Sequence, residues 1–240
     1  MSLAEFGADF TWGVATAAYQ IEGSPHADGK GPSIWDTFSH KPGVIADGTN
    51  GDVATDSYRR FPEDVALVYS MGFDAYRFSL SWPRIQPDGT GLNQKGLDHY
   101  KRLIDSCLGA GIEPWITLYH WDLPQALEDK GGWTNRDIVE IFCEYVQIVG
   151  ETFGDRVRDW MVFNEPLSFT MLGYMLGSHA PGRRGLNNFF PAIHHVNLAT
   201  ADGARALRAA ATNPVVGTTQ YLSPTLGSGP GPNLAQRAER

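Results

Sequence analysis

Hydrophobic and polar positions along this chain follow two alternating periods. Short runs rich in β-branched and aromatic residues are separated by longer stretches in which apolar residues recur every three to four positions. The runs predicted as strands cover residues 10–19, 73–80, 112–120, 157–164 and 215–221. The stretches predicted as helices cover residues 58–71, 94–110, 135–153 and 188–211. Strands that alternate with helices predict a parallel α/β sheet with right-handed crossovers.

Five strand–helix units occupy the 240 residues, and two architectures remain open at this point. One is an open, doubly wound five-stranded sheet that is complete as it stands. The other is the N-terminal five-eighths of a (β/α)8 TIM barrel, since eight such units would need roughly 380 residues. The sequence has no linker, repeat or low-complexity segment, so residues 1–240 are predicted to form a single domain. Residues 233–240 read like the opening of a further helix.

Charge, hydropathy and cysteine content exclude several classes of function. The 19 Lys and Arg residues and 27 Asp and Glu residues give a formal net charge of −8. An acidic chain without basic runs is poorly suited to bind nucleic acid or an anionic membrane, and no run approaches the ~20 apolar residues of a membrane helix. The start of the chain shows no secretory signal. We expect a cytoplasmic protein in which Cys107 and Cys143 are reduced thiols, with a structural disulfide as the alternative.

Polar and aromatic residues gather where the predicted strands end. Parallel α/β sheets and barrels bind their ligands at the carboxyl ends of the strands. The candidate site residues at these ends are Gln20, Arg77, His120, Trp121, Asn164 and Glu165. Carbohydrate sites use amides and charged groups for sugar hydroxyls, and flat aromatic rings for the apolar faces of the sugar. A phosphate-binding glycine-rich turn is missing from the sequence, which counts against a nucleotide-binding doubly wound sheet.

The tripeptide Asn164-Glu165-Pro166 is the sharpest local feature. In a regular strand, Asn164 and Glu165 would point to opposite faces of the sheet. For both side chains to serve one pocket, the strand must bulge or turn at its end. Pro166 has no N–H to donate to a neighbouring strand, so it fits a strand that stops at this point.

Six motifs occur in one order along the chain. They are FTWGVATAAYQIEG (10–23), SIWDTF (33–38), YRFSLSWPRI (76–85), YHWDLPQ (119–125), WMVFNEP (160–166) and GSHAPG (177–182). In these motifs the chain resembles the N-terminal portion of a glycoside hydrolase family 1 β-glucosidase, over residues 10 to about 224. The resemblance implies a (β/α)8 TIM barrel of which this chain holds roughly the first five strand–helix units, and which another chain completes.

The resemblance also implies an activity. It implies a retaining β-glycosidase that hydrolyses terminal β-D-glucosides, or short β-linked oligosaccharides, with two carboxyl groups about 5–5.5 Å apart. Glu165 would be the general acid/base, which calls for a raised pKa at the protonated stage. Asn164 would bind the sugar 2-hydroxyl, while Gln20, His120 and Trp121 would bind the other glycone hydroxyls and stack on the ring. No metal or organic cofactor is implied.

The nucleophile of this family, which lies in a Glu-Asn-Gly type motif, has no counterpart in the sequence. The only acids after Pro166 are Asp202, in a helical pattern, and Glu239, in the tail. By the resemblance, Arg77 would lie beside the nucleophile and keep it ionised. We therefore expect a complementary C-terminal fragment to carry the nucleophile, with self-association through the open first and fifth strands as the alternative.

Two other functions and several assignments also stay open. A truncated, non-catalytic sugar-binding or scaffold protein would keep the aromatic residues without turnover. A related hydrolase of 6-phospho-β-glycosides would keep the same strand ends. We assign Trp35 and Trp82 to the scaffold rather than to the ligand site, and Arg183 and Arg184 to a solvated loop. Leu167 stands where the family often has Trp, which affects the aglycone side only.

Overall fold

The order of the strands distinguishes the two predicted architectures. The structure is a computed structural model that describes residues 6–7 and 9–223. Its sheet has five parallel strands whose spatial order, β1-β2-β3-β4-β5, is also their order along the chain. The strands are β1 (Gly13–Ala15), β2 (Ala75–Ser79), β3 (Glu113–Tyr119), β4 (Asp159–Asn164) and β5 (Val215–Thr219). A doubly wound sheet reverses its strand order, whereas a barrel keeps it. The doubly wound alternative is therefore wrong, and the sheet has the order of successive TIM-barrel strands.

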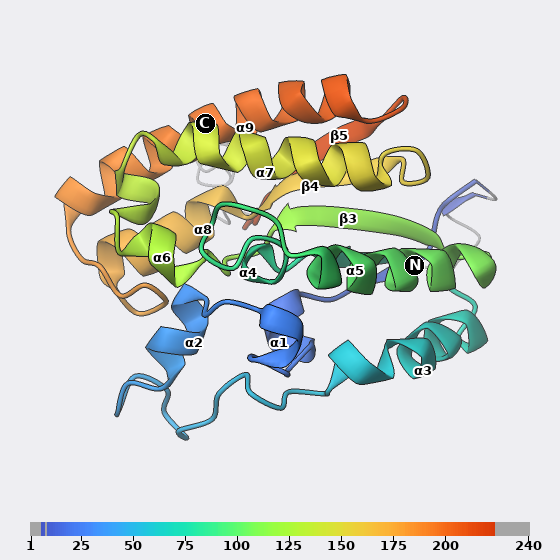
Figure 1. Ribbon diagram of the computed structural model, residues 1–240, viewed down its shortest axis with the longest axis horizontal. Coiled ribbons are helices and arrows are strands. Elements are labelled where there is room, and N and C mark those ends of the chain that lie inside the picture. Colours follow the sequence, from blue (N-terminus) through green and yellow to red (C-terminus); the bar gives the residue numbers. More distant parts are fainter. Residues whose placement is uncertain (1–5, 8, 224–240) are drawn as a thin grey trace, which may run out of the picture.

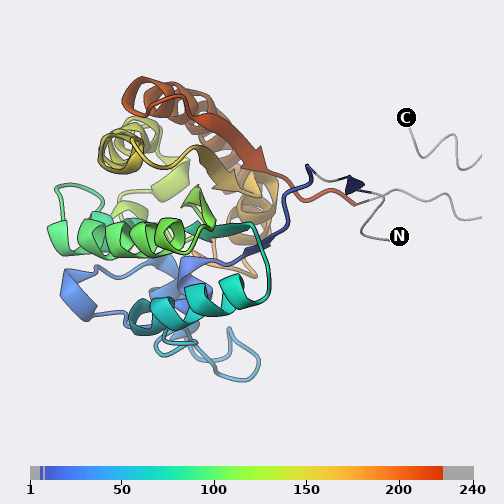
Figure 2. The same cartoon turned by 90° about the vertical axis from the view of Figure 1, so that its right-hand side faces the viewer.

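Four long helices connect successive strands and cover one face of the sheet. They are α3 (Ser57–Ser70), α5 (Gln94–Gly109), α7 (Ile138–Phe153) and α9 (Leu186–Ala210). Figure 2 shows them as an arc around the sheet, with the other face of the sheet left open. Their predicted ranges are confirmed to within three residues at each end. Between residues 6 and 223, none of the helices is both long and apolar enough to span a bilayer.

Short helices gather at the carboxyl ends of the strands (Figure 1). They are α1 (Ala18–Ile21), α2 (Ile34–Ser39), α4 (Trp82–Ile85), α6 (Gln125–Glu128) and α8 (Pro166–Thr170). Three further turns of helix are η2 (Ala27–Gly29), η3 (Gly132–Thr134) and the π-helix η4 (Met171–Leu176). The strand predicted over residues 10–19 is wrong in its second half, because the chain turns into α1 instead. The Ala18 N–H leaves the ladder to donate to Ser79 Oγ at 2.8 Å, and the Glu22 N–H closes the helical turn onto the Ala18 carbonyl.

Aromatic side chains fill the core between the sheet and the long helices. The ring of Trp82 stacks on Tyr145 with centroids 4.9 Å apart, and both side chains are fully buried. Phe142 of α7 packs against Trp82, Tyr145 and Phe163. The assignment of Trp82 to the scaffold is confirmed. Tight packing of this layer fixes where each strand ends and therefore where the rim residues lie.

The two cysteines lie on different helices and are not bonded to each other. Cys107 of α5 is buried, and Cys143 of α7 is half-buried. Burial raises the pKa of Cys107 to about 12 and that of Cys143 to about 11. The predicted free thiols are confirmed, and the disulfide alternative is wrong.

The first and fifth strands are open edges in the part of the chain that the structure describes. There β1 pairs only with β2, and β5 pairs only with β4. Val215 of β5 is 47% exposed, and Gly13, Ala15 and Gly217 are exposed as well. The prediction of open edges is confirmed for these residues. The helix predicted to open at residues 233–240 lies outside the described residues.

Asp122, three positions after the end of β3, is a buried carboxyl group to which no described residue donates a hydrogen bond. Its side chain is 1% exposed, and no residue between 9 and 223 donates a hydrogen bond to either of its oxygens. Burial raises the pKa of Asp122 to about 8, although the nearby Ser81 hydroxyl and the charge of Lys30 oppose the rise, to which the charge of Glu22 adds. The folded protein therefore keeps this group protonated over a pH range in which the unfolded chain releases the proton.

Replacing Asp122 by Asn is expected to change the pH dependence of stability. In the wild type the folded state binds one proton more than the unfolded state between about pH 4 and about pH 8, so its stability falls as the pH rises through that window. Asp122→Asn lacks this loss. Its free energy of unfolding is measured with urea at several pH values. The difference between the variant and the wild type should grow in favour of the variant by up to about 1.4 kcal/mol per pH unit across this window. A difference that stays constant with pH would contradict a protonated Asp122.

Candidate active site

An irregularity at the end of β4 determines where Asn164 points. The pairing of β4 with β5 shifts register between Met161 and Asn164, as at a β-bulge. Phe163 is fully buried in the aromatic core, on the helix side of the sheet. Asn164 Oδ1 instead accepts a hydrogen bond of 2.6 Å from Nη2 of Arg77. Arg77 lies between two core residues of β2, so its side chain points to the face that the helices do not cover.

Glu165 leaves the strand in a left-handed backbone conformation. Its φ of 49° and ψ of 67° are uncommon for a residue other than glycine. Its N–H donates to the Thr219 carbonyl of β5 at 2.9 Å, and Pro166 then begins α8. The Glu165 side chain is half-buried. The prediction that the strand bulges or turns here, and stops at Pro166, is confirmed.

Arg77 and Trp121 hold Asn164 from two sides. Besides its bond to Asn164, Arg77 donates from Nε to Thr117 Oγ1 at 2.9 Å. The indole Nε1 of Trp121 donates to the Asn164 carbonyl at 2.8 Å, and Trp121 itself has a φ of 77°. Burial lowers the pKa of Arg77, while the nearby charge of Glu165 opposes that shift. Three predicted site residues are therefore linked directly, and Glu165 lies within electrostatic reach of them.

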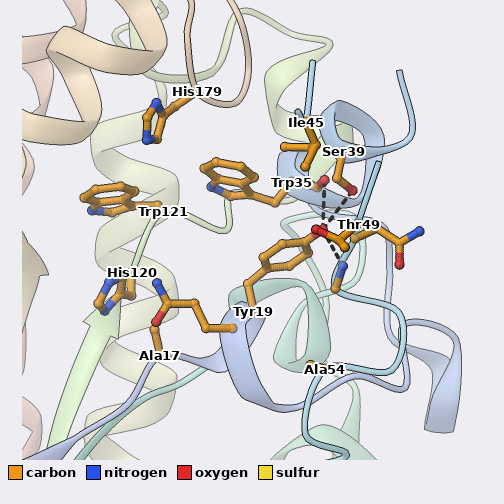
Figure 3. Close-up of a pocket in the computed structure, with 13 residues that line it drawn as sticks. Ala17, Tyr19, Trp35, Ser39, Ile45, Thr49, Ala54, His120, Trp121 and His179 are labelled. Atoms are coloured by element: carbon orange, nitrogen blue, oxygen red, sulfur yellow. Dashed lines mark hydrogen bonds between the residues drawn. The ribbon is translucent and has the colours of Figure 1, made fainter. Parts of the chain in front are cut away.

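A cavity of about 370 Å³ opens at this end of the sheet (Figure 3). Three of the predicted ligand residues, Gln20, His120 and Trp121, line it, whereas Arg77, Asn164 and Glu165 do not. Five rings line it, those of Tyr19, Trp35, His120, Trp121 and His179. A volume of this size and an aromatic lining are typical of small-molecule sites.

His120 is held neutral in this site. Burial lowers the pKa of His120 to about 4, and the positive charge of Arg77 adds to the shift. Its Nδ1 is buried, and among residues 9–223 it has no hydrogen-bond partner. A neutral imidazole offers one donor and one acceptor, which suits a hydroxyl group better than a charged ligand.

Trp35 lies closer to the candidate site than the sequence predicts. It was assigned to the scaffold, but its ring lines the cavity, 5.6 Å from the ring of His179 and 5.7 Å from that of Tyr19. On α2, Ile34 and Phe38 turn into the core, which leaves Trp35 on the other side of this short helix. Ile34 and Phe38 are one helical turn apart in the sequence, and this spacing was the signal that Trp35 lies outside their core-facing side. In Figure 3, His179 lies above the two indole rings.

The Tyr19 hydroxyl ties together three segments around the cavity (Figure 3). It donates to the Trp35 carbonyl at 3.1 Å, lies 2.9 Å from Ser39 Oγ and accepts the Gly51 N–H at 3.3 Å. A Cβ at Gly51 would lie 2.7 Å from the Tyr19 ring, so only glycine lets the loop approach this closely. The tyrosine thus connects α1, α2 and the loop around residue 51.

A buried ion pair anchors the segment that carries Gln20. Glu22, two residues further on, accepts from Arg84 Nε at 3.0 Å and from the Tyr100 hydroxyl at 2.6 Å. Burial alone would raise the pKa of Glu22, but Arg84, with help from His99 and Tyr100, holds it below its ordinary value. Arg84 is fully buried. Because the pair is ionised and buried, α1 has little freedom to move Gln20.

Arg183 is not part of a solvated loop, as the sequence had suggested. Its guanidinium donates to the buried carboxylate of Glu128 and, from Nη2, to the Glu128 carbonyl at 3.1 Å. Arg184 is exposed, as predicted. Within the described ranges, no three His, Cys, Asp or Glu side chains are grouped so that they could hold a metal ion.

Comparisons with known proteins agree with this geometry. The family model described as Glycosyl hydrolase family 1 matches residues 2–238. Beta-glucosidase A of Thermotoga maritima is 53% identical over 209 residues, which cover 87% of this chain and 47% of that protein. Beta-glucosidase A of Acetivibrio thermocellus is 51% identical over 224 residues, which cover 93% of this chain and 50% of the relative. The chain thus spans about half the length of these curated relatives.

Solved structures give the same result. A family 1 β-glucosidase from Thermotoga maritima superposes with a TM-score of 0.93 at 47% identity, over 98% of this chain and 53% of that one. The same kind of enzyme in complex with deoxynojirimycin gives a TM-score of 0.92 at 47% identity, over 96% and 52% of the two chains. With a TIM-barrel strand order, a rim site at the ends of the strands and a family match along nearly all its length, this chain belongs to glycosyl hydrolase family 1.

Proposed function

We propose that this chain supplies the acid/base half of a retaining β-glucosidase, with Glu165 as the general acid/base. The observation that carries the proposal is the end of β4, where a bulge and a left-handed Glu165 set the carboxyl group beside an asparagine held by Arg77 and Trp121. The relatives are named β-glucosidases, and solved Thermotoga maritima relatives are complexed with noeuromycin and deoxynojirimycin. A β-glucoside is accordingly the proposed substrate.

In the proposed mechanism Glu165 moves a proton in each of two steps. In the first step a carboxylate nucleophile attacks the anomeric carbon, the glycosidic C–O bond breaks, and Glu165 protonates the departing oxygen so that the aglycone leaves as an alcohol. In the second step the Glu165 carboxylate takes a proton from water, which attacks the anomeric carbon and breaks the glycosyl ester. Glucose leaves with retained configuration, and both carboxyl groups return to their starting states.

The other rim residues are proposed to bind the glycone. In the described part of the chain nothing accepts a hydrogen bond from Asn164 Nδ2, so this amide nitrogen is free to donate to the 2-hydroxyl. Gln20 and the neutral His120 line the cavity and suit the other hydroxyls, while the Trp121 ring offers a flat face to the sugar. Among the described residues, no Lys or Arg side chain lines the cavity, so this half of the site offers no positive charge to a 6-phosphate group.

The nucleophile is proposed to come from a companion segment outside these 240 residues. Asp202 is half-buried on α9 and pairs with Arg205, away from the strand ends. Glu239 lies outside the described residues. The open edges of β1 and β5 give the companion segment two places to pair, and further strands between them would close the barrel. The alternative is that two copies of this chain pair with each other through the same edge strands.

Mixing this chain with the C-terminal half of the Thermotoga maritima relative is expected to give a one-to-one complex that hydrolyses 4-nitrophenyl β-glucoside. The edge strands then find partners, and the relative's half brings the second carboxylate. Size-exclusion chromatography with light scattering measures the stoichiometry of the complex, and a colorimetric assay measures hydrolysis. Hydrolysis by the 240-residue chain alone would contradict a nucleophile on the companion. A complex that binds glucose without turnover would favour the non-catalytic alternative.

In that complex, Glu165→Gln is expected to lower kcat/KM for an alkyl β-glucoside by about 10²- to 10⁴-fold, because a poor leaving group needs the proton. A 2,4-dinitrophenyl β-glucoside, whose leaving group departs unprotonated, should still form the glycosyl ester. Added azide, which needs no general base, should then restore its turnover. The matched control is Glu144→Gln, at an exposed position of α7, which should behave as the wild type. Full activity of Glu165→Gln on the alkyl glucoside would exclude Glu165 as the acid.

A further inference from the structure

Two rim segments meet at one wall of the cavity. Residues 120–128 follow β3 and carry Trp121, while residues 177–185 follow the π-helix η4 and carry His179. The His179 ring stands edge-on to Trp121, with centroids 6.0 Å apart, and edge-on to Trp35. Trp35, Trp121 and His179 all line the cavity (Figure 3). The position of His179 therefore decides the shape of this wall.

The two segments are joined behind the wall by a buried carboxylate, that of Glu128. Its Oε1 accepts from Arg183 Nε, and its Oε2 accepts from the Tyr174 hydroxyl at 2.8 Å. Arg183 also donates from Nη2 to the Glu128 carbonyl at 3.1 Å and from Nη1 to Thr134 Oγ1 at 3.4 Å. Glu128 is 6% exposed and Tyr174 is fully buried. The guanidinium thus uses all three of its nitrogens to hold the loop after β4 against the loop after β3.

Two glycines make this arrangement possible. A Cβ at Gly132 would lie 2.0 Å from Glu128 Oε2, and a Cβ at Gly173 would lie 2.4 Å from the Ala180 carbonyl oxygen. A side chain at either position would push the carboxylate or the loop away. Close approach of the loop to η4 and of the carboxylate to η3 is therefore built into the sequence.

The backbone fixes the ends of the His179 segment but not its middle. The N–H groups of Ser178 and His179 donate to the Leu172 carbonyl at 3.0 and 3.3 Å, and the Gly185 N–H donates to the Met175 carbonyl at 2.8 Å. Arg183 lies between these two attachments. Its bonds to Glu128 tie the intervening stretch to the loop that carries Trp121.

We infer that Glu128 and Arg183 are positioning residues for substrate binding, because their ion pair locks the stretch that follows His179 to the loop that carries Trp121 and so fixes the two loops as one cavity wall. Neither residue lines the cavity, so both act through the wall and not on the reacting atoms. The lock is expected to set the affinity for the sugar and to leave bond cleavage at Glu165 unaffected. The kinetic effect expected of this ion pair rests on the proposed β-glucosidase function, whereas the geometry of the ion pair does not.

The kinetic test uses the complex of this chain with the relative's C-terminal half. Arg183→Lys keeps the positive charge but loses the planar guanidinium with its several N–H donors. Glu128→Gln keeps the size of the side chain but loses its charge. Both should raise KM for 4-nitrophenyl β-glucoside by about tenfold and change kcat by less than about twofold, since uniform binding is lost. A purely structural role would lower kcat with the active fraction and leave KM unchanged. The control is Arg184→Lys, at the exposed neighbour, and an equal effect there or an unchanged KM would overturn the inference.

A second measurement is independent of turnover. The chain is labelled with ¹³C-histidine, the companion half is left unlabelled, and His179 is assigned with His179→Gln. Burial lowers the pKa of His179 in the folded protein. Arg183→Lys and Glu128→Gln should shift this pKa back toward the ordinary value of histidine as the wall opens, whereas Arg184→Lys should not. An unchanged His179 titration in both variants would overturn the lock. A wild-type complex without hydrolysis would count against the proposed function alone.

Discussion

The register shift at the end of β4 is the constraint on which the site depends. With regular alternation, Phe163 would share a face with Met161, and Asn164 would face the helices. The shift instead leaves Phe163 in the core, stacked on Phe142 with centroids 4.8 Å apart, and turns Asn164 toward Arg77. Removing a buried phenylalanine from the core would cost about 1.5–3 kcal/mol. An apolar contact in the helix layer therefore keeps a polar amide on the face of the sheet that the helices leave uncovered.

Two ion pairs hold the rim around this strand end, and the carboxylate of each is buried. Glu22 with Arg84 anchors the segment of Gln20, and Glu128 with Arg183 joins the loops after β3 and β4. Each carboxylate also accepts a tyrosine hydroxyl. A buried pair adds little net stability, because desolvation offsets the attraction, but separating its partners leaves a buried charge uncompensated. Such pairs therefore serve mainly to fix the positions of the segments they join, and here these segments carry the cavity walls.

The sequence predicted what local periodicity determines. Long helices and the ends of most strands came out correctly, because amphipathic patterns and the strand-end rule depend on neighbouring residues. Elsewhere the prediction was wrong because contacts between residues far apart in the sequence decide the structure. The strand predicted through Tyr19 ends early because a backbone N–H finds Ser79, 61 residues away. Arg183 was assigned to solvent because its partner Glu128 lies 55 residues back. Strand order, which decided between barrel and doubly wound sheet, is likewise absent from any local pattern.

Arg77 explains why the proposed mechanism calls for a carboxylate from elsewhere. Among the described residues its guanidinium donates to two neutral oxygens, those of Thr117 and Asn164, and its charge is opposed at longer range by Glu165. Burial lowers the pKa of His120, and the charge of this half-buried cation adds to the shift; the same charge would lower the pKa of any carboxyl group beside it. A nucleophile must be ionised while the acid/base holds its proton. Both demands are met when the second carboxylate lies nearer to Arg77 than Glu165 does, on the open face of the sheet that this chain leaves uncovered.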